Sequence, residues 1–150
     1  SLVLPIVKGS VHSPLSARYD GKKFKLDTND FVAGQIQFKF SNDGCTLTTT
    51  IEGKDAAIKF GWENWVLNND TQPYIFPVAG RLHMPSKIAG TATWINDSTL
   101  QLNARFVEAM HGDKITCKFD GDKVAVSFMN SVSENTKNSP EKRSPLSGTI

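Results

Sequence analysis

The chain has 150 residues, of which 39% are hydrophobic and 21% charged, and it contains nine Phe and three Trp. This length and composition suit one domain with a full hydrophobic core, and they exclude a disordered or low-complexity protein. Seventeen Lys and Arg against fifteen Asp and Glu leave a net charge of +2 without a long block of like charges. We therefore expect no nucleic-acid or anionic-membrane partner.

The two ends of the chain differ from its middle. Residues 1–20 contain Pro5, Gly9 and Pro14 and show no sustained periodicity, so we interpret them as a linker or entry segment. This segment has neither an initiator Met nor a signal peptide, which suggests a piece cut from a longer chain. Residues 131–150 read as a polar tail that adds at most a short edge contact near its end. No run of about 18 apolar residues occurs, so we predict no transmembrane helix.

The first half of the middle region alternates apolar and polar residues with period 2, which is typical of half-buried strands. A strand over 35–40 ends at 41–44, where an Asp-Gly step predicts a hairpin turn. The next strand covers 45–51 and includes Cys45, Leu47 and Thr49 on its apolar face. A turn then leads into a third strand over 56–60.

The second half predicts a four-strand meander. Its alternating segments, joined by short polar turns, are 89–95, 100–106, 115–119 and 124–128. An opening strand near 24–26 and a short one near 65–67 complete the set, and no segment has convincing helical periodicity. Closing such hairpins on themselves removes exposed edges. We therefore predict an all-β fold, an antiparallel up-and-down β-barrel of about eight strands over residues 21–130.

The sequence shows no catalytic constellation. No G-x-S-x-G motif is present, and the one S-x-x-K match, Ser139 to Lys142, lies in the polar tail beside Pro140. Its usual partner motifs are missing from the sequence. We predict that the chain is not an enzyme and uses no cofactor.

Metal binding is not predicted either, because the three histidines are scattered and no pair has ligand spacing: His12, His83 and His111. Cys45 and Cys117 both lie on the apolar face of their predicted strands. They are expected to be either two buried thiols or a disulfide across the core, and the sequence leaves both alternatives open.

Four residues are candidates for ligand contact. Trp62 and Trp65 lie close together beside Glu63, and such aromatic clusters bind sugars or apolar ligands as well as packing into cores. Their opposite strand parity places one in the core and the other at the barrel mouth. Arg81 and His83 share one face of a predicted segment, which points either into the barrel or into water.

Several spaced motifs together resemble the lipocalin-like C-terminal domain appended to serine β-lactamase-related, penicillin-binding-protein-like hydrolases of Bacteroides-type bacteria. The motifs span about residues 20–130 and are Phe24–Asn29, Cys45-Thr46-Leu47, Gly61-Trp62, KIAGTATW at 87–94, STLQL at 98–102, RFVE at 105–108 and DKITCKFDGDKV at 113–124. The resemblance implies a lipocalin-like barrel.

The resemblance also implies a role. In that family the catalytic serine and lysine belong to the preceding hydrolase domain, so none of the family's catalytic residues transfers to this chain. The implied function is a non-catalytic accessory domain that packs on or modulates the hydrolase domain of its parent chain, in the periplasm or outside the cell. The alternative is a barrel that binds a small apolar or carbohydrate ligand on its own.

Overall fold

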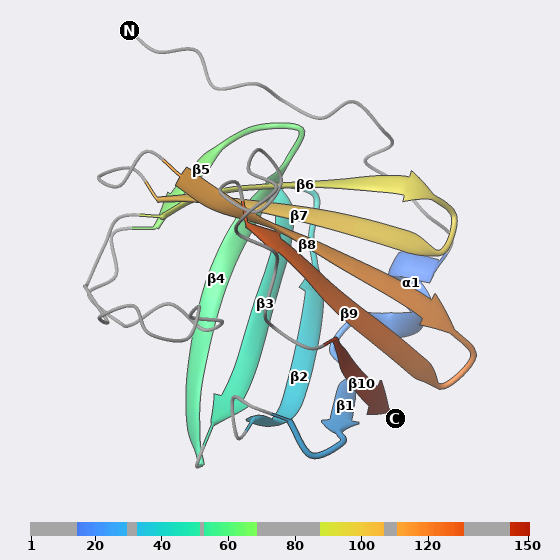
Figure 1. Ribbon diagram of the computed structural model, residues 1–150. Coiled ribbons are helices and arrows are strands. Elements are labelled where there is room, and N and C mark those ends of the chain that lie inside the picture. The colour runs from blue at the N-terminus through green and yellow to red at the C-terminus, as the bar shows by residue number, and fades with distance from the viewer. Residues whose placement is uncertain (1–14, 30–32, 52, 69–87, 107–110, 131–144) are drawn as a thin grey trace, which may run out of the picture.

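The computed structural model describes residues 15–29, 33–51, 53–68, 88–106, 111–130 and 145–150 (Figure 1). This part of the chain is all-β apart from one short helix, as the alternation predicts. The elements in chain order are α1 (Leu15–Tyr19), β1 (Lys23–Leu26), β2 (Ala33–Phe40), β3 (Gly44–Ile51), β4 (Lys54–Trp62), β5 (Val66–Asn68), β6 (Ile88–Asn96), β7 (Thr99–Phe106), β8 (His111–Asp120), β9 (Lys123–Asn130) and β10 (Leu146–Thr149).

The strands form one closed barrel. Their order is β4-β3-β2-β1-β10-β9-β8-β7-β6, and a pairing between β4 and β6 joins the two ends of this series. All eight pairings along the series are antiparallel, so β4 and β6 point the same way and their closing contact is parallel. β5 pairs with β6 beyond the closing contact. Figure 1 shows β2, β3 and β4 running across the direction of β6 to β9.

The predicted barrel is confirmed, but the ring has nine strands rather than about eight. The additional strand is β10, which lies between β1 and β9 and pairs with both. Two of its four residues, Leu146 and Gly148, are buried. A strand this short carries too little alternation to stand out from the polar residues before it.

The barrel also extends before residue 21. Tyr19, at the end of α1, is 1% exposed, and its hydroxyl donates a hydrogen bond of 2.7 Å to the carbonyl of Gly121. Its ring stacks on Phe119 with 4.5 Å between the centroids. The segment interpreted as a linker therefore contributes a core residue, and the helix is only five residues long, too short for a helical period to be visible in the sequence.

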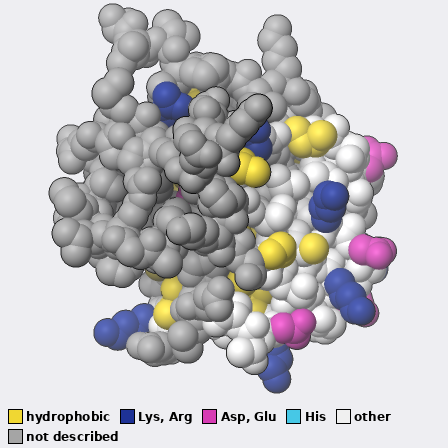
Figure 2. Space-filling view, viewed as in Figure 1, with side chains coloured by type: hydrophobic (Ala, Val, Ile, Leu, Met, Phe, Trp, Pro, Cys, Tyr) yellow, Lys and Arg dark blue, Asp and Glu magenta, His cyan; other side chains and the backbone are white. Residues whose placement is uncertain are grey.

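The outer surface carries charges of both signs. In the view of Figure 2, the described part of the molecule shows Lys and Arg side chains interspersed with Asp and Glu and a few hydrophobic groups. This mixture agrees with the small net charge of +2. Among the described residues, no helix has the length and hydrophobicity needed to cross a membrane.

We predict that replacing Leu146 by alanine destabilises the barrel by about 2–5 kcal/mol, because the side chain is 2% exposed and its removal leaves a cavity at a strand that joins both halves of the sequence. Urea unfolding followed by fluorescence measures this change. The control is Ile150→Ala. Ile150 follows the last residue of β10 and is 51% exposed, so its replacement should change stability by less than about 0.5 kcal/mol. Equal losses for the two variants would contradict a structural role for β10.

Candidate functional site

One end of the barrel interior is filled by aromatic rings; we call it the aromatic end. Phe119 lies at the centre, with its ring centroid 5.1 Å from that of Phe38 and 5.9 Å from that of Trp94. Phe40 stacks on Trp62 with centroids 6.2 Å apart. Tyr19, Phe24, Phe38 and Trp94 are at most 1% exposed. Side chains this tightly packed leave no room for a ligand at this end.

The opposite end, which we call the open end, has smaller core-facing side chains. It is the end where β2, β4 and β8 begin and where β3 and β7 stop, since neighbouring strands alternate in direction. Four core-facing positions here are Ala33, Thr49, Ala56 and Ala104. Small side chains fill less of the interior than rings do, so a bound molecule would displace fewer packed atoms at the open end than at the aromatic end.

Polar groups are also buried at the open end. Thr49 follows Cys45 and Leu47 on the core-facing side of β3 and is 0% exposed, and its hydroxyl has no hydrogen-bond partner. Asp113 lies opposite Ala104 in the register of β7 and β8 and is 5% exposed. In the described part of the chain, none of the buried core-facing side chains is Lys, Arg or His.

The closing contact between β4 and β6 is short and depends on small residues. Only Gly61 and Trp62 of β4 pair with β6. A Cβ atom on Gly90 would lie 2.5 Å from the carbonyl oxygen of Lys59, so no larger residue fits there without moving the backbone. The side chain of Thr91 adds a hydrogen bond of 3.1 Å to the carbonyl of Gly61.

Asn68 continues this seam where β4 and β6 no longer pair. Its Oδ1 accepts a hydrogen bond of 2.9 Å from the amide of Lys59, and its Nδ2 donates to the carbonyls of Lys59 and Ile88 at 3.0 and 3.1 Å. The side-chain amide thus takes the place of a peptide group between the two strands. The seam is held by one side chain as much as by the backbone.

The tryptophans predicted to contact a ligand do not form an exposed platform. Trp62 is half-buried, and its Nε1 donates a hydrogen bond of 2.7 Å to the carbonyl of Ser41. Trp65 is half-buried with its Nε1 enclosed, and Trp94 is 1% exposed. Trp62 and Trp65 keep part of their surface accessible, so contact of these residues with a ligand stays a prediction. Arg81 and His83 lie outside the described residues.

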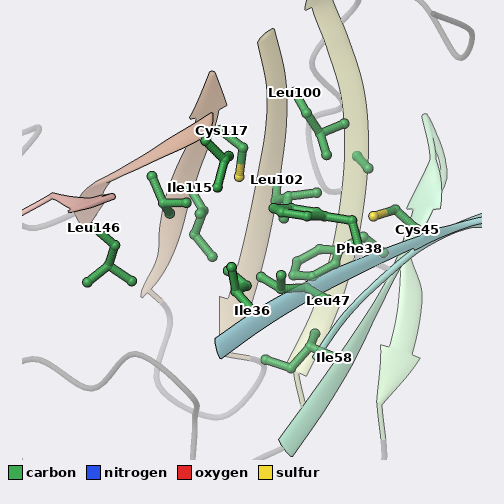
Figure 3. Packing of buried hydrophobic residues seen from close by; sticks show 14 of the residues in the cluster. Ile36, Phe38, Cys45, Leu47, Ile58, Leu100, Leu102, Ile115, Cys117 and Leu146 are labelled. Atoms are coloured by element: carbon green, nitrogen blue, oxygen red, sulfur yellow. The ribbon is translucent and has the colours of Figure 1, made fainter. Parts of the chain in front are cut away.

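Cys45 and Cys117 point into the core from β3 and β8, as Figure 3 shows, and both are free thiols in the structure. Burial raises the pKa of both thiols, and for Cys45 the nearby Cys117 and Asp20 raise the pKa further. A disulfide between them stays a prediction.

Two features of the site were not identified from the sequence. Thr49 was placed on the apolar face of its strand, and a hydroxyl in an otherwise apolar row was the available signal. Asn68 gave no signal, because its role depends on the strands that happen to meet beside it. The described residues contain no group of three or more His, Cys, Asp or Glu positioned for a metal, and Ser139 and Lys142 lie outside them.

Comparisons with known proteins identify the fold. No family model matches the chain, and no curated protein matches it. Among solved structures, a fatty-acid-binding protein from the brain of Drosophila melanogaster matches with a TM-score of 0.57 at 15% identity, over 88% of this chain and 99% of that one. The Schistosoma mansoni fatty-acid-binding protein in complex with arachidonic acid gives 0.60 at 12% identity, over 89% and 96%. Human cRBP IV gives 0.51 at 13%, over 86% and 94%.

These likenesses show a lipocalin-like or fatty-acid-binding-protein-like barrel, and at such low identity they show the fold alone. They contain nothing about a hydrolase. The accessory role in a serine hydrolase and the periplasmic or extracellular location therefore stay predictions.

We predict that Asn68→Ala weakens the seam and lowers stability by about 1–2 kcal/mol, since its three hydrogen bonds to the backbone of β4 and β6 are lost. Native-state hydrogen exchange should accelerate at the amide of Lys59, which donates to Asn68. Asn64→Ala, an exposed asparagine in the preceding turn, is the matched control and should leave this amide protected. An unchanged exchange rate at Lys59 in the Asn68→Ala variant would contradict the role of Asn68 in joining β4 and β6.

We also predict that stability falls as the pH rises above about 8.5, the pKa of a cysteine in an unfolded chain. Because burial raises both folded-state pKa values, the folded protein keeps protons that the unfolded chain releases, and each thiol costs at most about 1.4 kcal/mol per pH unit. Urea unfolding under reducing conditions between pH 7.5 and 9.5 measures the decline. It should be shallower in a Cys45→Ala/Cys117→Ala double variant, and identical declines would contradict this account.

Proposed function

We propose that the chain is a non-enzymatic binding protein that holds one small apolar ligand inside its barrel. The observation that carries this proposal is the division of the interior: rings close the aromatic end, while Ala33, Thr49, Ala56 and Ala104 line the open end. An apolar ligand with its long axis along the barrel would bury its surface there without displacing the ring cluster.

The size of the ring supports the proposal. A barrel of about eight strands is just wide enough to be filled by its own side chains or to hold one small ligand, and this ring has nine. With alanines at several core-facing positions, the side chains at the open end reach less far toward the barrel axis than those at the aromatic end.

The structural relatives support the same class of ligand. Two of the structures named above are fatty-acid-binding proteins, and one of these holds arachidonic acid. Both are named for binding rather than for a reaction, and the sequence of this chain shows no catalytic motif.

The test is binding of diphenylhexatriene, a hydrocarbon probe that fluoresces in apolar surroundings. The wild-type chain should bind it saturably at one site per chain. Ala104→Leu adds bulk at the open end and should lower the affinity at least about tenfold, at a stability cost of about 1–3 kcal/mol.

Ala125→Leu is the matched control, because Ala125 is exposed on the outer face of β9. This variant should bind the probe like the wild type. Absence of saturable binding by the wild-type chain, or equal affinity in the Ala104 and Ala125 variants while both remain folded by circular dichroism, would overturn the proposed function.

A further inference from the structure

Thr49 is a buried residue whose hydroxyl group has no hydrogen-bond partner in the packed interior. It is 0% exposed, it lies on the core-facing side of β3, and its hydroxyl has no partner. Its neighbours across the two strand pairings are Ile36 and Ala56, neither of which offers a side-chain hydrogen-bonding group. A buried hydroxyl without a partner costs free energy, and a valine of nearly the same shape would not.

We propose that the open end selects an aliphatic ligand with a neutral hydroxyl group, and that Thr49 is the hydrogen-bond partner of that group. The inference rests on the proposed function and specifies its ligand class. A threonine hydroxyl both donates and accepts, so it matches an alcohol, which also does both. The bond would satisfy the hydroxyl that is unpartnered without a ligand.

The charges of the interior argue against a carboxylate as the preferred group. A buried carboxylate needs a cation or several donors to offset its lost hydration. The buried core-facing side chains in the described ranges include no Lys, Arg or His. Among the described residues, the buried charged-type side chain at this end is Asp113, an acid, which offers no positive charge to an anion.

The second enclosed donor of the core does not compete for this role. Nε1 of Trp94 also has no partner, but Trp94 packs between Phe40 and Phe119 in the aromatic end. Thr49 is the next core-facing position after Leu47 toward the open end, where the small side chains are. The geometry therefore points to Thr49 as the polar contact.

The experiment displaces diphenylhexatriene from the wild-type chain at pH 7 with 1-decanol or with decanoate, two ligands of equal chain length. We expect 1-decanol to displace the probe at a concentration at least about tenfold lower than decanoate. Tighter or equal binding of decanoate would overturn the inference while leaving the proposed function intact. Failure of the probe itself to bind would overturn the proposed function and this inference with it.

Substitutions at Thr49 test whether its hydroxyl contacts the ligand. Thr49→Val should lower the affinity for 1-decanol about tenfold, which corresponds to about 1.4 kcal/mol, and should change the affinity for the hydrocarbon probe much less, because the probe has no hydroxyl group. The same variant should raise the urea midpoint of the unliganded protein, because it removes an unpartnered buried hydroxyl. Wild-type affinity for 1-decanol in this variant would overturn the role of Thr49.

Three further variants serve as controls for this result. Thr48→Val changes the neighbouring threonine, which lies on the outer side of β3, and should bind 1-decanol like the wild type. Thr49→Ser retains the hydroxyl and should retain the preference for the alcohol. If Thr49→Val does not fold, Thr49→Ala removes the same hydroxyl, and the same loss of alcohol affinity is expected of it.

Discussion

The closure of the ring between β4 and β6 is the constraint on which the rest of the structure depends. An odd number of strands joined by antiparallel pairings leaves its first and last members pointing the same way, so one parallel contact is unavoidable. Two residue pairs are all the backbone provides there, and Asn68 bridges the next gap with its side-chain amide. Glycine at position 90 lets the strands approach closely enough for this arrangement.

Closure of the ring encloses an interior whose two ends are packed differently. The aromatic end is secured by Tyr19 and Phe119 and resembles the interior of an ordinary core, whereas the open end combines small side chains with a hydroxyl that has no partner. The ring packing at the aromatic end stabilises the fold, whereas the unpartnered hydroxyl at the open end lowers its stability. Such a division is compatible with the proposed binding function, which requires a barrel that folds without a ligand.

Much of the fold follows from the sequence because period-2 alternation directly reports which side chains face inward. It placed β2, β3 and the meander of β6 to β9, and it put Cys45, Leu47 and Thr49 on one face. It missed β10, whose four residues are too few for a period, and α1, whose five residues form little more than one turn. The seam was out of reach for a different reason, since the partners of Asn68 are nine and twenty residues away and are set by the register of the ring. The polar character of Thr49 was visible, but its missing partner was not.

The position of β10 between β1 and β9 has a consequence for how the protein folds. Residues 146–149 must pair with residues 25–26 and with residues 123–126 before the ring is complete. Because β1 and β10 are more than a hundred residues apart, their pairing is entropically costly and slow. We therefore expect the pairing of β10 with β1 to be a late step in the folding of the barrel.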